Sequence, residues 1–136
     1  MRHSTRLFVL SLLFIGPLIS ACDKDDTATP PANASYKGDF VSSAHTTSGT
    51  ASIDSNETIL TLTNFKTDSG PDLNIYLAAN LNSITADYID LGDIKGLNGT
   101  YEYDLPDNTD YEHFRYVVVW CVDFDVNFGF AGLVKQ

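Results

Sequence analysis

The sequence has few basic residues, and this scarcity limits what the chain can bind. It contains eight Lys and Arg against eighteen Asp and Glu in 136 residues, a formal net charge of −10. A surface this acidic repels the phosphate backbone of nucleic acids and the anionic head groups of membranes. We therefore expect no nucleic-acid partner, and any attachment to a membrane must come from something other than charge.

The sequence also lacks the short motifs of common catalytic sites. It has no G-x-S-x-G, H-E-x-x-H, P-loop or C-x-x-C pattern. Met1 is the only methionine, so a copper site with a weak axial methionine is not available. The residues alone therefore identify no enzyme, and the question of an enzymatic activity stays open.

The first residues have the pattern of a bacterial lipoprotein signal. Two arginines precede an apolar run from Leu7 to Ile19, which is too short for a comfortable membrane span. Ile19-Ser20-Ala21-Cys22 then has the lipobox form, with small residues leading into a cysteine. We predict that residues 1–21 are a signal peptide and that Cys22 carries acyl chains, such as palmitate, that anchor the protein in the lipid bilayer. The alternative is an ordinary cleaved signal with a chance cysteine.

The segment after the anchor is polar and rich in proline. Asp23 to Ser35 has almost no apolar side chains, so it cannot bury enough surface to fold. We predict a lipidated cysteine and disordered tether over residues 22–35 and one globular domain over residues 36–136. The mature chain keeps six Lys and Arg and all eighteen acidic residues, a net charge of −12. The expected location is the bacterial cell envelope, facing the periplasm or the outer surface.

Cysteine is scarce as well, and this restricts disulfide formation. The chain has two cysteines, Cys22 and Cys121. If Cys22 carries lipid, then Cys121 is a single thiol in an oxidising compartment, and no intramolecular disulfide can form.

Hydrophobic residues alternate with polar ones along most of the domain, and no segment has a helical pattern of useful length. In residues 58–65, Leu60 and Leu62 should face the core while Thr61 and Thr63 face water. We predict an all-β fold, an antiparallel β-sandwich of seven to nine strands. The expected strands are Gly38–Ser42, Thr50–Ile53, Thr58–Phe65, Leu73–Ala79, Tyr88–Leu91, Thr100–Leu105, Phe114–Phe124 and Val126–Leu133.

Turn residues separate these strands. Asp54-Ser55-Asn56-Glu57 and Ser69-Gly70-Pro71-Asp72 each predict a break between two strands. Asn98-Gly99 is the strongest hairpin signal, because a type I′ turn needs positive φ at both positions.

Within the expected strand Phe114–Phe124, both faces are apolar from Tyr116 to Val122. One face carries Phe114, Tyr116, Val118 and Trp120, and the other carries Val117, Val119 and Cys121. A central strand that is covered on both sides has this pattern.

Four pieces of the sequence resemble the DM-thirteen domain, a module that accompanies DOMON domains in animal proteins and also occurs in bacterial exported proteins. They follow one another in order and cover most of the mature domain. The last piece combines Trp120-Cys121 with Phe128-Gly129 and Ala131-Gly132-Leu133. The pieces are GDFVSSAHTTSGTASI, LTNFKTDSGPDLNIYLA, LGDIKGLNGTYEYDLP and VVVWCVDFDVNFGFAGL.

The resemblance implies a function in electron transfer. The family's characteristic cysteine is suggested to act as a bare thiol or to hold a prosthetic group such as haem, and Cys121 matches its position. His45 falls where the family often has a histidine, and Trp120 directly precedes the cysteine. The resemblance thus makes Cys121 a candidate redox thiol or ligand, and His45 and Trp120 candidates for contacting a cofactor.

The residues themselves leave the role of Cys121 open. Free cysteine is often a buried packing residue. An activated thiol needs a cationic neighbour, and Arg115 and Asp123, on the same expected face, would act on its pKa in opposite directions. A copper site from His45, His113 and Cys121 is conceivable, but the spacing matches no familiar pattern. A haem would need a larger apolar cavity than so small a domain readily provides.

Two functions therefore remain. The first is a redox or electron-transfer accessory that acts through Cys121. The second is a non-enzymatic binding or interaction module of the cell envelope, in which Cys121 is a structural core residue. The sequence identifies neither a redox partner nor a binding target.

Overall fold

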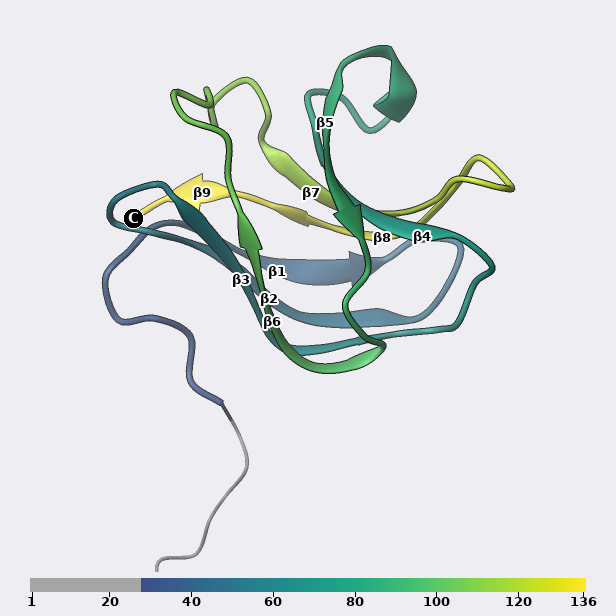
Figure 1. The fold of residues 1–136 in the computed structure, drawn as a ribbon, viewed down its shortest axis with the longest axis horizontal. Coiled ribbons are helices and arrows are strands. Elements are labelled where there is room, and N and C mark those ends of the chain that lie inside the picture. Colours follow the sequence, from purple (N-terminus) through teal and green to yellow (C-terminus); the bar gives the residue numbers. More distant parts are fainter. Residues whose placement is uncertain (1–27) are drawn as a thin grey trace, which may run out of the picture.

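The computed structural model describes residues 28–136, which form nine strands and one short 3₁₀ helix, η1 (Ile84–Ala86) (Figure 1). The expected signal peptide and Cys22 lie outside the described residues. Within the described part, no helix has the length and apolar character needed to cross a membrane. The strands are β1 (Ala34–Ser42), β2 (Thr47–Asp54), β3 (Ile59–Thr67), β4 (Leu73–Ala78), β5 (Tyr88–Asp93), β6 (Asn98–Asp104), β7 (Tyr116–Cys121), β8 (Val126–Gly132) and β9 (Val134–Lys135).

All strand pairs are antiparallel, and the sheet curls so that its two halves face each other. The strand order is β5-β4-β7-β8-β1-β2-β3-β6, with β9 also paired to β1. Strand β1 belongs to both halves, because its first part pairs with β2 and β9 while residues 40–42 pair with β8. This arrangement confirms the predicted all-β, sandwich-like fold and the predicted number of strands.

The main core lies between the two halves. Leu60 and Leu62 from β3 and Tyr103 from β6 pack there against Val117 and Val119 from β7. These inward positions alternate along their strands, as the sequence pattern predicted. A second, smaller cluster covers the opposite face of β4 and β7 and contains Tyr76, Ala78, Ile84, Val118 and Trp120.

The predicted hairpin at Asn98-Gly99 is wrong. Both residues lie inside β6 and pair with β3, where Gly99 stands opposite Phe65. Gly99 has φ +152°, whereas Asn98 is not among the residues with positive φ. Strand β5 pairs with β4 instead of β6, so the chain crosses from one half of the sheet to the other near this point. The residues of a turn do not determine which strand β5 pairs with.

The prediction that the threonines of β3 face water is also wrong. Thr61 and Thr63 are both buried. Strand β3 has neighbours on both sides, with Ser52 and Glu102 opposite Thr61. Polarity alone therefore did not predict the burial of these short side chains.

Two other segments differ from the prediction in length. Strand β1 begins at Ala34, so the last two residues of the expected tether lie in a strand, and the Asn64 side chain donates a hydrogen bond to the Ala28 carbonyl. Strand β7 ends at Cys121, and residues 122–125 form the turn to β8. Phe114 precedes β7 and packs against the main core instead of sharing a face with Tyr116.

The predicted turn between β2 and β3 is confirmed and is organised by one carboxylate. Asp54 Oδ1 accepts hydrogen bonds from the backbone N–H groups of Thr58 and Ile59, at 2.7 and 2.8 Å. Partial burial acts to raise the pKa of this carboxyl, but the backbone N–H donors outweigh it and hold the pKa below its usual 3.8.

We expect Asp54→Asn to be less stable than the wild type at neutral pH. A carboxyl whose pKa is lowered by folding stabilises the protein above its unfolded pKa, and this contribution is lost as the pH falls through the folded pKa. The deficit of the variant should therefore shrink below about pH 4. Urea denaturation of both proteins at neutral and at acid pH measures it, and a deficit of constant size would contradict the role of the charge.

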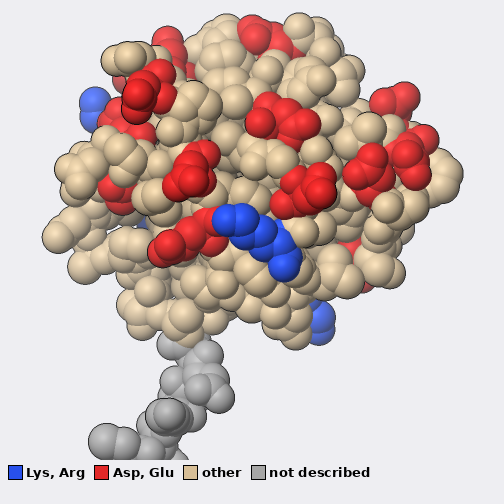
Figure 2. All heavy atoms as spheres, in the orientation of Figure 1, with Lys and Arg blue, Asp and Glu red and all other residues tan. Residues whose placement is uncertain are grey.

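Acidic side chains are spread over the face shown in Figure 2, with few basic ones among them. This agrees with the charge balance of the sequence. The basic side chains do not gather into a patch on this face.

Candidate functional site

Cys121 is the last residue of β7 and lies in the main core. Its exposed fraction is 0%, and it is the free cysteine of the described residues. Its strand partners are Leu73 on β4 and Val126 on β8. The sulfur is therefore surrounded by apolar side chains of the sheet and is out of reach of solvent in this conformation.

Trp120 precedes Cys121 but faces the other way. Successive side chains of a strand point to opposite faces, so Trp120 packs in the second cluster while Cys121 packs in the main core. The two candidate residues are adjacent in the chain, and their side chains do not share a pocket.

The charged neighbours expected for Cys121 are not on its strand. Arg115 precedes β7, and Asp123 lies in the turn after it. Arg115 instead borders a surface cavity of about 420 Å³ that is also lined by Tyr36, Tyr111 and Lys135. The sequence argument that these two charges act on Cys121 through a shared strand face is therefore wrong, because the regular strand is shorter than predicted.

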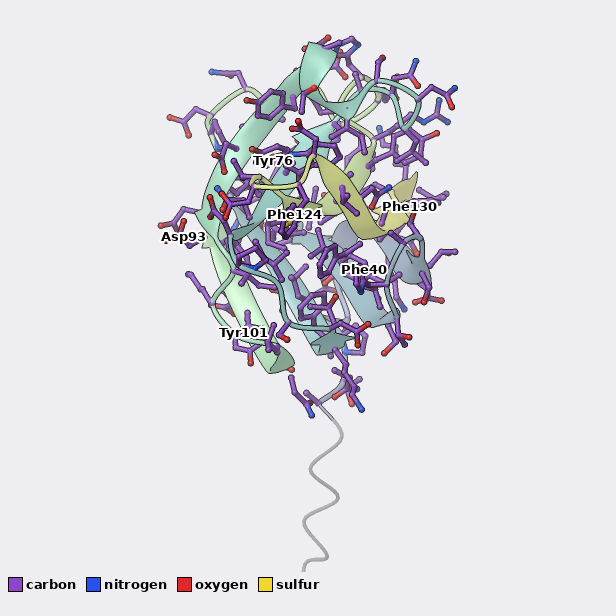
Figure 3. The ribbon with its side chains drawn as sticks, turned by 90° about the vertical axis from the view of Figure 1, so that its right-hand side faces the viewer. Phe40, Tyr76, Asp93, Tyr101, Phe124 and Phe130 are labelled. Atoms are coloured by element: carbon purple, nitrogen blue, oxygen red, sulfur yellow. The ribbon has the colours of Figure 1, made fainter. Side chains whose placement is uncertain are left out.

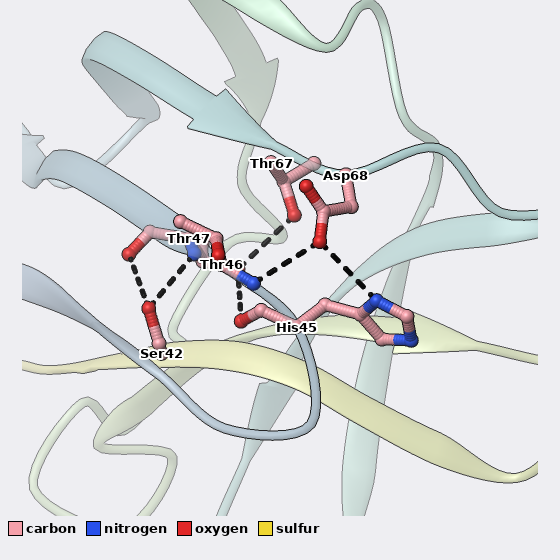
Figure 4. A network of polar contacts seen from close by, with 6 residues as sticks. All are labelled: Ser42, His45, Thr46, Thr47, Thr67 and Asp68. Carbon is pink, nitrogen blue, oxygen red and sulfur yellow. Dashed lines mark hydrogen bonds and ion pairs between the residues drawn. The ribbon is translucent and has the colours of Figure 1, made fainter.

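His45 lies in the loop between β1 and β2, at the surface. Its ring stacks on Phe128, with the ring centroids 3.8 Å apart and an interplanar angle of 28°. Its Nδ1 lies 3.3 Å from Asp68 Oδ2, which also accepts a hydrogen bond from the Thr46 N–H at 3.2 Å (Figure 4). The loop is thus tied to the segment that follows β3.

Hydroxyl groups hold the base of the same loop. The Ser42 hydroxyl accepts a hydrogen bond from the Thr47 N–H at 3.0 Å and donates one to the Thr47 carbonyl at 3.2 Å. Thr47 and Thr67 share a buried hydrogen bond between their hydroxyl groups, also at 3.0 Å (Figure 4). These bonds explain why a short loop at the surface has a defined shape.

Phe128 is the residue that connects His45 to the core. It is skipped in the pairing of β7 with β8, where Val119 faces Gly129 and Trp120 faces Asn127. Such a bulge redirects a side chain, and the Phe128 ring enters the main core that also contains Cys121. His45 therefore lies on the outside of this core and Cys121 within it.

The two histidines of the described part do not join Cys121 in one site. His113 Nε2 lies 2.6 Å from Asp87 Oδ2, while His45 pairs with Asp68. Among residues 28–136, no group of three or more His, Cys, Asp and Glu side chains is arranged to hold a metal ion. A copper site built from His45, His113 and Cys121 is therefore not formed.

A haem held through Cys121 does not fit the packing around this residue. Side chains of the sheet fill the space around the Cys121 sulfur, since Cys121 has no exposed surface. The two best-defined cavities of the described part, of about 420 and 250 Å³, are bordered by neither Cys121, His45 nor Trp120. The chemistry at Cys121 that this fold can support is that of the thiol itself.

Sequence reasoning missed two residues beside Trp120. Tyr76 on β4 stacks with Tyr88 on β5 and also with Trp120 on β7. The strands that contain them were predicted, but the order of strands that brings them together was not. The alternation of side chains could have assigned each tyrosine to one face of its strand. It could not have shown that β5, β4 and β7 are consecutive in the sheet.

Comparison with known proteins gives one family. A family model described as electron transfer DM13 matches residues 39–133, which is nearly the whole β domain from β1 to the residue after β8. No curated protein and no solved structure gives a match. The matched range contains Cys121 as well as His45 and Trp120. The chain therefore belongs to the electron transfer DM13 family.

Proposed function

We propose that this chain is an exported lipoprotein, anchored in a membrane of the bacterial cell envelope through acylated Cys22, and that its β domain transfers electrons with Cys121 as the redox residue. The observation that carries this proposal is the family match, which spans the domain and includes its free thiol. The partner is a redox protein or a small electron carrier of the envelope, and the domain acts as an electron-transfer accessory.

The burial of Cys121 restricts the kind of redox chemistry. Thiol–disulfide exchange requires direct attack by one sulfur on another. A sulfur with an exposed fraction of 0% cannot make that contact unless the end of β7 opens. Oxidation of the thiol by one electron, which passes to the redox partner while the thiol proton is lost, gives a thiyl radical and needs no contact between two sulfurs. One-electron transfer therefore suits this geometry better than exchange.

The redox role of Cys121 predicts a difference between the wild type and Cys121→Ala. We expect protein-film voltammetry of the full-length wild type to give a redox wave that the variant lacks, because the variant has no thiol. Alanine is the suitable replacement, since it fits the buried position without adding a polar group. Circular dichroism of both proteins checks that the variant is folded.

The result that would overturn this role is the same wave, or no wave, in both proteins. The second proposed function would then apply, in which the domain is a non-enzymatic binding module and Cys121 is a packing residue. One observation favours it, since Cys121 is enclosed by Leu73, Val119 and other members of the main core. In that case Cys121→Ala should change only the stability of the fold.

The anchor is tested separately. We expect Cys22→Ala to move the protein from the membrane fraction to the soluble fraction, because the variant loses its acyl chains. Each methylene group that these chains bury in the bilayer contributes about 0.8 kcal/mol to membrane binding. Cys121→Ala is the matched control and should stay with the membrane. Retention of the Cys22→Ala variant on membranes after a high-salt wash would refute lipid anchoring at Cys22.

A further inference from the structure

Three aromatic side chains cross the outer face of three neighbouring strands. The rings of Tyr88 and Tyr76 have centroids 4.4 Å apart and an interplanar angle of 22°. The rings of Tyr76 and Trp120 have centroids 6.2 Å apart and an angle of 23°. We refer to Tyr88, Tyr76 and Trp120 as the aromatic row.

The pairing of the strands explains the row. Strands β5, β4 and β7 are consecutive in the sheet. Tyr88 stands opposite Ala78, two residues beyond Tyr76 on β4. Trp120 stands opposite Asn74, two residues before Tyr76. Aromatic side chains can reach diagonal neighbours of this kind. Each ring of the row therefore contacts the next ring, which lies on the adjacent strand.

The row leads from the surface into the protein. Tyr88 is 40% exposed, whereas Tyr76 and Trp120 are 4% and 8% exposed. At its inner end, Trp120 is joined to Cys121 by a peptide bond, with the two side chains on opposite faces of β7. Close packing of three rings would suffice to stabilise the sheet, but packing alone does not require oxidisable rings at all three positions.

We propose that Tyr88, Tyr76 and Trp120 form a path for single electrons, which enter at the surface at Tyr88 and reach Trp120 beside Cys121. This inference rests on the proposed electron-transfer function and names the residues that connect the domain's interior to an outside donor. Phenol and indole rings are, with the thiol, the side chains that give up one electron most readily.

Each step of the path conserves electrons and protons. A one-electron oxidant, such as a radical or an oxidised metal complex, takes an electron from Trp120, and loss of the indole N–H proton to solvent leaves a neutral indolyl radical. An electron from the Tyr88 phenol passes through Tyr76 and, together with a proton from solvent, restores the indole. The phenol proton of Tyr88 goes to water, which leaves a neutral phenoxyl radical. A one-electron donor at the surface then reduces Tyr88, and a proton returns from water.

The surroundings of Tyr76 support its position in the middle of the path. Burial, together with the charges of Asp90, Tyr88 and Asp72, raises the pKa of Tyr76 to about 12. Of the two phenols, Tyr88 is the one that reaches solvent, so it is placed to pass a proton to water when it is oxidised.

Pulse radiolysis with the azide radical, a one-electron oxidant that prefers indole to phenol, tests the path in the full-length protein. Trp120 is the one tryptophan of the chain, so the indolyl radical signal reports on this residue alone. We expect the indolyl signal of the wild type to convert into a phenoxyl signal at a rate that does not depend on protein concentration. Tyr76→Phe, which keeps a ring in the stack, and Tyr88→Phe should each abolish this conversion.

The matched control is Tyr101→Phe, because Tyr101 is a partly buried tyrosine well separated from Tyr76 (Figure 3). It should leave the conversion unchanged. Conversion at the wild-type rate in both Tyr76→Phe and Tyr88→Phe would overturn the path. The path does not include Cys121, so Cys121→Ala should show the same conversion as the wild type. The two proposals therefore fail in different measurements: the path fails if the tyrosine variants convert at the wild-type rate, and the role of Cys121 fails if the wild type and Cys121→Ala give the same voltammetry.

Discussion

Replacing Phe65 by alanine should lower the free energy of unfolding by about 3–5 kcal/mol, the usual cost of removing a large aromatic ring from a core. Phe65 has no exposed surface. Its ring contacts Phe40 edge-on with centroids 5.2 Å apart, and Tyr101 at 6.3 Å. The truncation would leave a cavity between β1, β3 and β6, which the surrounding strands can close only in part. Urea denaturation followed by circular dichroism measures the change.

The matched control is Phe124→Ala. Phe124 is 68% exposed in the turn between β7 and β8, and we expect its replacement to change the free energy of unfolding by less than about 0.5 kcal/mol. Similar losses in the two variants would show that Phe65 is not in the core that the structure describes.

Gly38→Ala should destabilise the fold by about 3 kcal/mol, the upper end of the usual cost of overpacking. A Cβ atom at Gly38 would lie 2.1 Å from the backbone oxygen of Gly132. Gly38 is the point at which β1 changes partners, since Lys37 pairs with β9 and Phe40 pairs with β8. The backbones that approach each other there cannot separate without weakening one of the two pairings.

Gly132→Ala is the control for this close approach. A Cβ atom at Gly132 would meet the Tyr116 ring at 3.8 Å, which is an ordinary contact. Differential scanning calorimetry of both variants gives the comparison, and the melting temperature should fall much further for Gly38→Ala. An equal fall would mean that the loss of glycine itself, and not the approach to Gly132, determines the effect.

Much of the fold could be predicted because it depends on local patterns. Alternation along a strand assigns each side chain to a face whatever the partner strand is. Leu60 and Leu62 were therefore predicted correctly as inward-facing. The turn at Asp54 was also predictable, because its carboxylate bonds to backbone groups within five residues.

Predictions that required a choice of partner strand failed. Asn98-Gly99 has good hairpin chemistry, but the flanking strands pair with β4 and β3 and not with each other. The burial of Thr61 similarly depends on β3 having neighbours on both sides. These errors share a cause, since turn propensity and polarity are local properties and strand order is not.

In the candidate site, too, some features follow from local sequence and others depend on strand order. The sequence by itself determined the position of Cys121 next to Trp120 on an apolar strand, and the alternation that turns their side chains to opposite faces. Only the tertiary structure decided that Cys121 is fully buried and that Arg115 and Asp123 lie off its strand. It alone also brings Tyr76 and Tyr88 to Trp120, because a stack across three strands depends on their order in the sheet, which long-range packing selects.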